Sequence, residues 1–252
     1  MSPLNSFELA AADGKLIRGD WSIGKDRQIL FITGFLSKRW GNKSKALAQW
    51  CEEKGWGFCC YDVRGFGESE GTFTDYTLSD WIADAGLVLN MLKDGPPVSI
   101  VGNSFGGWIA WMMAQECSVV EKLLLIAPAF DAIGVRAREI SADRRTRWQD
   151  TGWMPWDDDP LHKDWPLSWK WVEESEAYWS KRFSQLRRVK TTLFHGLQDR
   201  TIHPRTSWQF VDELLVRDPD YPIELILKMG DHRLSGPEHL DTFRRLVLDT
   251  GQ

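Results

Sequence analysis

A serine between two glycines is the residue of this chain best placed to act as a nucleophile. Ser104 lies in Gly102-Asn103-Ser104-Phe105-Gly106, which fits G-x-S-x-G, between a predicted strand (98–101) and a predicted helix (105–115). On a tight turn from strand to helix, larger side chains at the two glycine positions would collide, and the serine hydroxyl would stand clear of the backbone. The N–H of Phe105 could then point at a developing oxyanion. The alternative, a chance match in a glycine-containing loop, is disfavoured by the flanking elements.

A serine hydroxyl is a weak nucleophile at neutral pH, so it needs a histidine to take its proton and an acid to orient that histidine. His232 is the best candidate for the base because it follows a predicted strand (223–227), and sites in open α/β sheets form at the carboxyl ends of strands. We interpret His195 as a core residue, His203 as a loop residue near the site and His239 as a surface residue. His162 lies in a segment unsuited to holding it in a fixed position.

Asp199 is the best candidate for the acid, because it follows another predicted strand (191–194) and completes the chain order Ser104, Asp199, His232. Asp131, which follows the predicted strand 123–127, is the alternative. Three such residues, each after a strand, predict acyl transfer at a serine. We expect neither a cofactor nor a metal, since no HxH or HExxH spacing occurs.

The elements that must position these residues alternate between short apolar strands and amphipathic helices, which predicts an α/β fold with a mostly parallel sheet covered on both faces. The expected strands are 7–11, 16–23, 29–33, 57–61, 98–101, 123–127, 191–194 and 223–227. The expected helices are 43–54, 78–92, 105–115, 207–216 and 237–248. We expect one domain over 1–252, with a helical lid inserted at about 131–188, where no strand is predicted.

The predicted lid contains seven of the 15 tryptophans. In one interpretation they form an aromatic wall for an apolar acyl or aryl group, with Trp153 and Trp156 contacting the substrate. In the other, most of the rings only pack the lid onto the main domain. The arginine run at 136–147 is interpreted as a solvated helix face, and the alternative is that one arginine contacts an anionic substrate group.

The composition of the chain limits which partners and which cellular compartment we expect. The net charge of −5 argues against nucleic acid as a partner. No run approaches the roughly 18 to 20 apolar residues of a membrane span, and we see no secretory signal. Four cysteines without a CxxC pair indicate a reducing compartment. We therefore expect a cytoplasmic protein that acts on a small-molecule ester or thioester.

The chain resembles the α/β-hydrolase superfamily in segments that cover nearly all of it outside the predicted lid. These segments are 33–35, 62–69, 102–106, 195–199 and 230–232. The stretches Gly34-Phe35-Leu36-Ser37 and Asp231-His232-Arg233 also resemble the group that contains a mitochondrial acyl-protein depalmitoylase, which cleaves acyl glucuronides as well.

The resemblance implies the α/β-hydrolase fold and a carboxylesterase or thioesterase that works through an acyl-enzyme. It also implies an oxyanion hole formed by the backbone N–H groups of Phe35 and Phe105. Thr33 stands where most relatives have histidine, a change that leaves the backbone donor of Phe35 in place. The alternative is a non-catalytic small-molecule-binding protein on the same fold, which would not need all three polar residues.

Overall fold

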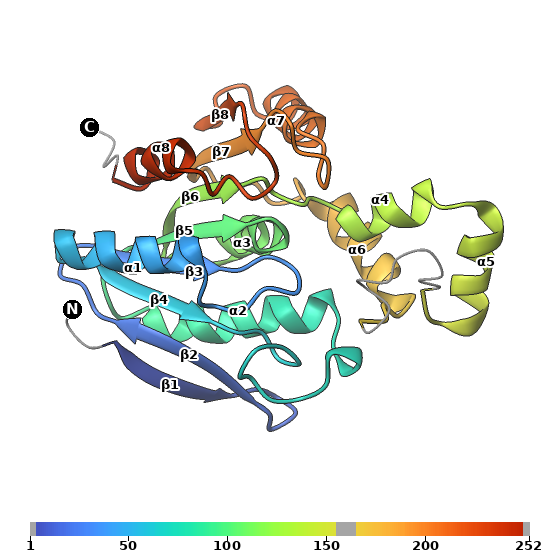
Figure 1. Cartoon of the computed structure of the whole chain (residues 1–252), viewed down its shortest axis with the longest axis horizontal. Coiled ribbons are helices and arrows are strands. Elements are labelled where there is room, and N and C mark those ends of the chain that lie inside the picture. Colours follow the sequence, from blue (N-terminus) through green and yellow to red (C-terminus); the bar gives the residue numbers. More distant parts are fainter. Residues whose placement is uncertain (1–3, 155–164, 249–252) are drawn as a thin grey trace.

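The computed structural model describes residues 4–154 and 165–248 and builds them around an eight-stranded sheet (Figure 1). The strand order is β1-β2-β4-β3-β5-β6-β7-β8. The strands are β1 (Asn5–Ala10), β2 (Leu16–Ser22), β3 (Gln28–Ile32), β4 (Gly57–Tyr61), β5 (Val98–Asn103), β6 (Val120–Ile126), β7 (Lys190–Gly196) and β8 (Ile223–Lys228). Only the β1–β2 and β2–β4 pairs are antiparallel, which confirms the prediction of a mostly parallel sheet.

Helices cover both faces of this sheet. The helices of the described residues are α1 (Asn42–Lys54), α2 (Leu78–Leu92), α3 (Phe105–Glu116), α4 (Ala132–Glu139), α5 (Ala142–Thr151), α6 (Lys170–Lys181), α7 (Arg205–Arg217) and α8 (Pro237–Leu248). Of these, α1, α2, α3, α7 and α8 pack on the two faces of the sheet. Alternate residues of β3 point to opposite faces. Ile29 and Phe31 pack in a core with α1 and α8, whereas Leu30 and Ile32 pack in a larger core with α2, α3 and α7. The sheet is therefore buried on both sides, as its apolar strands require.

Helices α4, α5 and α6 form an insertion between β6 and β7, so they begin beyond the carboxyl end of β6 (Figure 1). Contacts between α6 and α2 anchor this insertion to the main body. Trp171 of α6 packs on Trp81 of α2 with ring centroids 5.0 Å apart, and the Glu174 carboxylate accepts the Ser79 N–H at the start of α2, at 2.8 Å. A carboxylate at a helix N-terminus is electrostatically favourable, so α6 is fixed against α2.

Candidate active site

Ser104 occupies a strained turn between β5 and α3, with φ 54° and ψ −120°. A hypothetical Cβ at Gly102 would lie 2.5 Å from the carbonyl oxygen of Gly106, and one at Gly106 would lie 2.3 Å from that of Ile32. The expected need for glycine at both positions therefore has a direct steric cause. The Ser104 N–H donates to the Ile126 carbonyl at 2.8 Å, which ties the turn to β6. Such contacts must outweigh a backbone strain on the order of 1–3 kcal/mol.

Ser104, His232 and Asp199 form one chain of hydrogen bonds, although they come from loops after three different strands. The His232 Nε2 lies 3.0 Å from the Ser104 Oγ, and its Nδ1 lies 2.6 Å from the Asp199 Oδ2. The carboxylate can only accept, so His232 donates from Nδ1 and its Nε2 is free to accept the serine proton. This is the geometry that general-base activation of a serine requires.

Asp199 is fully hydrogen-bonded, and a second histidine contributes to this. The Nε2 of His195, on β7, lies 3.0 Å from the same Oδ2, while Oδ1 accepts the N–H groups of Thr201 and Ile202, each at 2.8 Å. Burial raises the pKa of Asp199, but the hydrogen bonds from His195, His232 and the Ile202 backbone outweigh it and hold the pKa well below its usual value. Asp199 is therefore a stable anion that orients His232.

His195 is the residue of this site that sequence reasoning missed. It is buried, as expected of a core histidine, and its Nδ1 contacts the Ser207 hydroxyl at 2.7 Å. Its Nε2 faces two acceptors, the Asp199 carboxylate and the Ile202 carbonyl at 2.9 Å, so Nε2 carries the proton. The available signal was the spacing of four residues between His195 and Asp199 across a loop that follows a strand.

The rival candidates lie elsewhere. Asp131 binds Arg138 at 2.5 Å rather than His232, and burial raises its pKa. His203 is exposed. His239 is buried, with Nε2 on a backbone carbonyl at 2.6 Å, so its expected surface position is wrong. His162 lies outside the described residues.

The loop after β3 and the start of α3 bring the two expected oxyanion residues, Phe35 and Phe105, to Ser104. A hypothetical Cβ on Gly34 would lie 3.2 Å from the Ser104 Cβ, so the loop that carries Phe35 runs against the nucleophile. Phe105 is the first residue of α3, so its N–H has no acceptor in a preceding helical turn. Both N–H groups therefore adjoin Ser104, and their role as an oxyanion hole stays a prediction.

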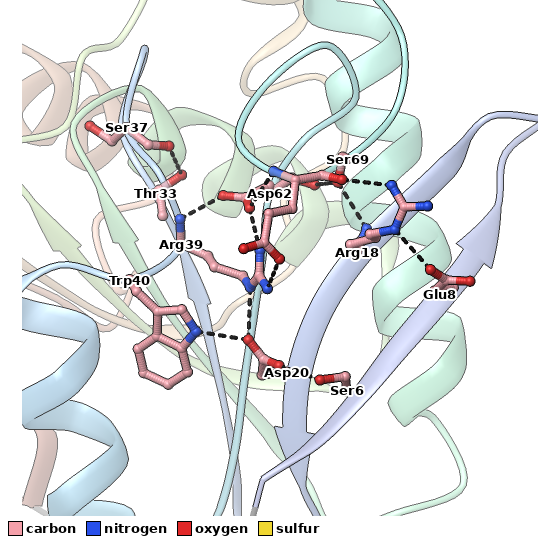
Figure 2. Close-up of polar contacts among 11 residues, drawn as sticks. Ser6, Glu8, Arg18, Asp20, Thr33, Ser37, Arg39, Trp40, Asp62 and Ser69 are labelled. Atoms are coloured by element: carbon pink, nitrogen blue, oxygen red, sulfur yellow. Dashed lines mark hydrogen bonds and ion pairs between the residues drawn. The ribbon is translucent and has the colours of Figure 1, made fainter.

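A buried arginine fixes the far end of this loop, as Figure 2 shows. The Arg39 guanidinium donates to Asp20 at 2.7 Å, to Asp62 at 2.5 Å and to Glu68 at 2.6 Å, and its backbone N–H donates to Asp62 at 2.6 Å. Burial alone would lower the pKa of Arg39. Its contacts with the three carboxylates raise the pKa by more, so it lies above its usual value. These contacts tie the loop after β3 to β2 and to the loop after β4.

Aromatic rings from elements that do not carry the base pack together beside Ser104. Phe35 and Phe105, which flank the nucleophile, have ring centroids 5.7 Å apart. Trp81 and Trp171 pack on Phe105 at 5.8 and 5.7 Å, and Trp171 is only 1% exposed. These rings form an apolar wall that joins the insertion to the nucleophile.

Of the two tryptophans expected to contact the substrate, one is not part of that wall and the other is not among the described residues. Trp153 is 42% exposed and pairs with Ser168 inside the insertion. Trp156 lies outside the described residues. Trp171 instead packs on both Phe35 and Phe105.

Residues 29–247 match the model of the alpha/beta hydrolase family. The chain belongs to this family, which confirms the predicted fold class and the predicted hydrolase. Within the described residues, no cluster of three or more histidine, cysteine or acidic side chains could hold a metal ion. No helix of the described segments is long and apolar enough to cross a membrane.

Similar proteins fall in the group that the sequence resembled. The chain is 28% identical over 218 residues to the Homo sapiens protein named "Palmitoyl-protein thioesterase ABHD10, mitochondrial", covering 84% of this chain and 68% of that protein. The Mus musculus protein of the same name is 26% identical over 251 residues, covering 93% and 76%. The structure of mouse alpha/beta hydrolase domain-containing protein 10 matches with a TM-score of 0.84 at 24% identity, over 97% of both chains. A putative hydrolase from Agrobacterium vitis S4 matches with a TM-score of 0.80 at 23% identity, over 97% and 98%.

The expected cytoplasmic location is wrong. The curated relatives, from human and mouse as well as orang-utan, cattle and rat, are all named as mitochondrial, which points to mitochondria instead. The expectation rested on reduced cysteines and on a chain without a secretory pattern. Those features do not distinguish the cytosol from another reducing compartment.

Proposed function

We propose that this protein is a serine hydrolase that cleaves thioesters or carboxylic esters through an acyl-enzyme. The observation that carries the proposal is the position of His232, which contacts the Ser104 hydroxyl at 3.0 Å and the Asp199 carboxylate at 2.6 Å. The relatives named palmitoyl-protein thioesterases support a thioester as one substrate class.

In the first half of the proposed reaction, His232 takes the Ser104 proton while the Ser104 Oγ attacks the acyl carbon. The carbonyl oxygen becomes an oxyanion that the N–H groups of Phe35 and Phe105 stabilise. Asp199 stabilises the imidazolium of His232, which then protonates the leaving thiol or alcohol. The C–S or C–O bond breaks and leaves an ester on Ser104.

In the second half, His232 takes a proton from water, whose oxygen attacks this ester. His232 then returns the proton to the Ser104 Oγ as the acyl–oxygen bond breaks, which releases the carboxylic acid and restores the free enzyme. The apolar wall formed by Phe35, Phe105, Trp81 and Trp171 would contact the acyl group, because an apolar surface lowers the cost of removing an acyl chain from water. The insertion, through Trp171, would act as the lid that keeps bulk water from the oxyanion.

The test compares Ser104→Ala with the matched control Ser118→Ala, since Ser118 is an exposed serine after α3. Wild type and the control should hydrolyse p-nitrophenyl butyrate and be labelled by a fluorophosphonate. Ser104→Ala should lose labelling and lose turnover by on the order of 10³-fold or more. A folded wild-type protein that neither hydrolyses the ester nor is labelled by the fluorophosphonate would instead favour the non-catalytic binding protein.

A further inference from the structure

A cavity of about 250 Å³ adjoins the nucleophile on the face of the sheet that α1 covers. Its walls come from the loop after β3, the start of α1, the elbow before Ser104 and the loop after His232. Gly34 and Asn103 form the wall nearest to the nucleophile, since both neighbour Ser104. The apolar wall consists of Phe35 from the loop after β3 and of rings from α2, α3 and α6, and none of these rings lines the cavity.

This cavity is basic. Lys38, Lys43 and Arg233 line it, together with the hydroxyls of Thr33 and Ser37, and none of the described lining residues is acidic. Helix α1 begins in its wall and has no acidic side chain in its first turn, so the positive end of the helix dipole adds to the field. The nearby Asp231 carboxylate uses Oδ1 to accept the N–H groups that follow His232.

Lys43 is held in the cavity wall because its Nζ donates to the backbone carbonyl of Arg233. Burial lowers the pKa of Lys43 to about 8, with Asp231 raising it and Arg233 lowering it further. A half-buried ammonium has lost part of its hydration. An anion bound in the cavity would replace that lost solvation, so we expect the cavity to favour an anion.

The position of His232 indicates that this cavity accepts the leaving group. His232 must protonate the leaving atom, so that atom departs on the side of His232. Arg233 and Ser235, which line the cavity, follow His232 directly in its loop. The acyl chain would then lie along the aromatic rings, and the leaving group would point toward the basic cavity.

We propose that this cavity binds a phosphate group carried by the leaving thiol or alcohol, an assignment that rests on the proposed function. Lys38 and Lys43 line the cavity from the stretch that leads from β3 into α1, and Arg233 lines it from the loop after β8. Three cations around one cavity suit the several oxygens of a phosphate better than a planar carboxylate. Because Gly34 and Asn103 border both Ser104 and the cavity, the spacer between the leaving atom and the phosphate is short.

The test uses thioesters that share one acyl group and differ in the leaving thiol. S-butanoyl-2-mercaptoethyl phosphate is compared with neutral S-butanoyl-2-mercaptoethanol, and the readout is the ratio of their kcat/KM values. Wild type should prefer the phosphate by roughly tenfold. The ratio is used because a lost Lys43–Arg233 contact could disturb the base loop and slow both substrates alike.

Lys43→Gln and Arg233→Gln should each bring this ratio close to one. Lys45→Gln is the matched control, because it removes the same charge from an exposed position of α1 that does not line the cavity, and it should keep the wild-type ratio. A carboxylate analogue, S-butanoyl-3-mercaptopropionate, should fall between the two. A higher kcat/KM for the carboxylate than for the phosphate would contradict the choice of phosphate.

Calorimetric binding of 2-mercaptoethyl phosphate separates this inference from the proposed function, because it needs no turnover. Binding that Lys43→Gln weakens, with no thioester hydrolysis, would leave the anion site standing and overturn the hydrolase. Hydrolysis of both thioesters at equal rates, with no binding of 2-mercaptoethyl phosphate, would overturn the anion site and leave the hydrolase standing.

Discussion

The polar network and the apolar wall near Ser104 are built from different kinds of interaction. On the side of the base, directional hydrogen bonds fix every polar atom of Asp199, which contacts two histidines and two backbone N–H groups. The apolar wall, in contrast, consists of rings whose centroids lie 5.0 to 5.9 Å apart. Proton transfer requires one arrangement of the hydrogen-bonded groups, whereas rings can pack in several ways.

This difference suggests a division of labour. Hydrogen bonds of 2.6 to 3.0 Å hold the proton-transfer path within narrow limits, so small changes there should affect the rate of chemistry. Ring packing contributes stability and shape, so changes there should affect folding and the choice of acyl group. The predictions below test this division, beginning with the largest effect.

Asp199→Asn should reduce kcat for a p-nitrophenyl ester by on the order of 10³- to 10⁴-fold, because an amide that donates to Nδ1 favours the wrong tautomer of His232. The matched control is Asp231→Asn, since an asparagine Oδ1 can still accept the two N–H groups that Asp231 accepts. Steady-state kinetics of both variants check this. Comparable losses in the two would show that Asp199 is not the orienting acid.

His195→Ala should lower kcat/KM by roughly tenfold, because one charge-assisted hydrogen bond to Asp199 is lost. His195→Gln can still donate to Asp199 and should restore much of the rate. Equal losses of kcat/KM in His195→Ala and His195→Gln would limit His195 to a packing role.

Trp171→Ala should act on stability and specificity rather than on the proton path. Removing this buried ring should cost about 3–5 kcal/mol of unfolding free energy and raise the octanoyl-to-butanoyl ratio of kcat/KM, because space opens beside Phe35 and Phe105. Trp208→Ala is the control, because Trp208 is 54% exposed on α7, and it should change stability by no more than about 0.5 kcal/mol. An unchanged chain-length ratio in Trp171→Ala would remove this ring from the acyl site.

The smallest expected effect is a pH dependence of the phosphate preference. Burial lowers the pKa of Lys43 to about 8, and the charges that face it are Asp231, which raises this pKa, and Arg233, which lowers it. Lys43 is thus charged below pH 8 and neutral above it, so the wild-type preference should fall severalfold between pH 7 and pH 9. Rates of the two thioesters across this range check it. An equal fall in Lys43→Gln would assign the titration to another group.

Sequence reasoning reached the polar side of Ser104 because each of its residues follows a strand. Parallel strands end at one edge of a sheet, so the loops that hold Ser104, Asp199 and His232 had to meet there. The same reasoning found the fold, since apolar strands alternating with amphipathic helices permit few architectures.

The parts that sequence reasoning missed depend on segments that meet only after folding. Arg39, Asp20 and Asp62 belong to three separate segments, and no local pattern links them. Tryptophan content marked the insertion as aromatic, but it could not say that Trp171 would face inward and Trp153 outward. His195 read as a core residue because its contact with Asp199 is set by the shape of the loop.

The acyl-enzyme tests the central claim most directly. Wild-type protein mixed with p-nitrophenyl butyrate, quenched in acid within the first turnovers and measured by intact mass spectrometry should gain one butanoyl group, which peptide mapping should place on Ser104. Ser104→Ala should gain none and turn over no substrate above the reduced level expected of it. Turnover at the wild-type rate by Ser104→Ala, or an acyl group on another residue, would contradict the account.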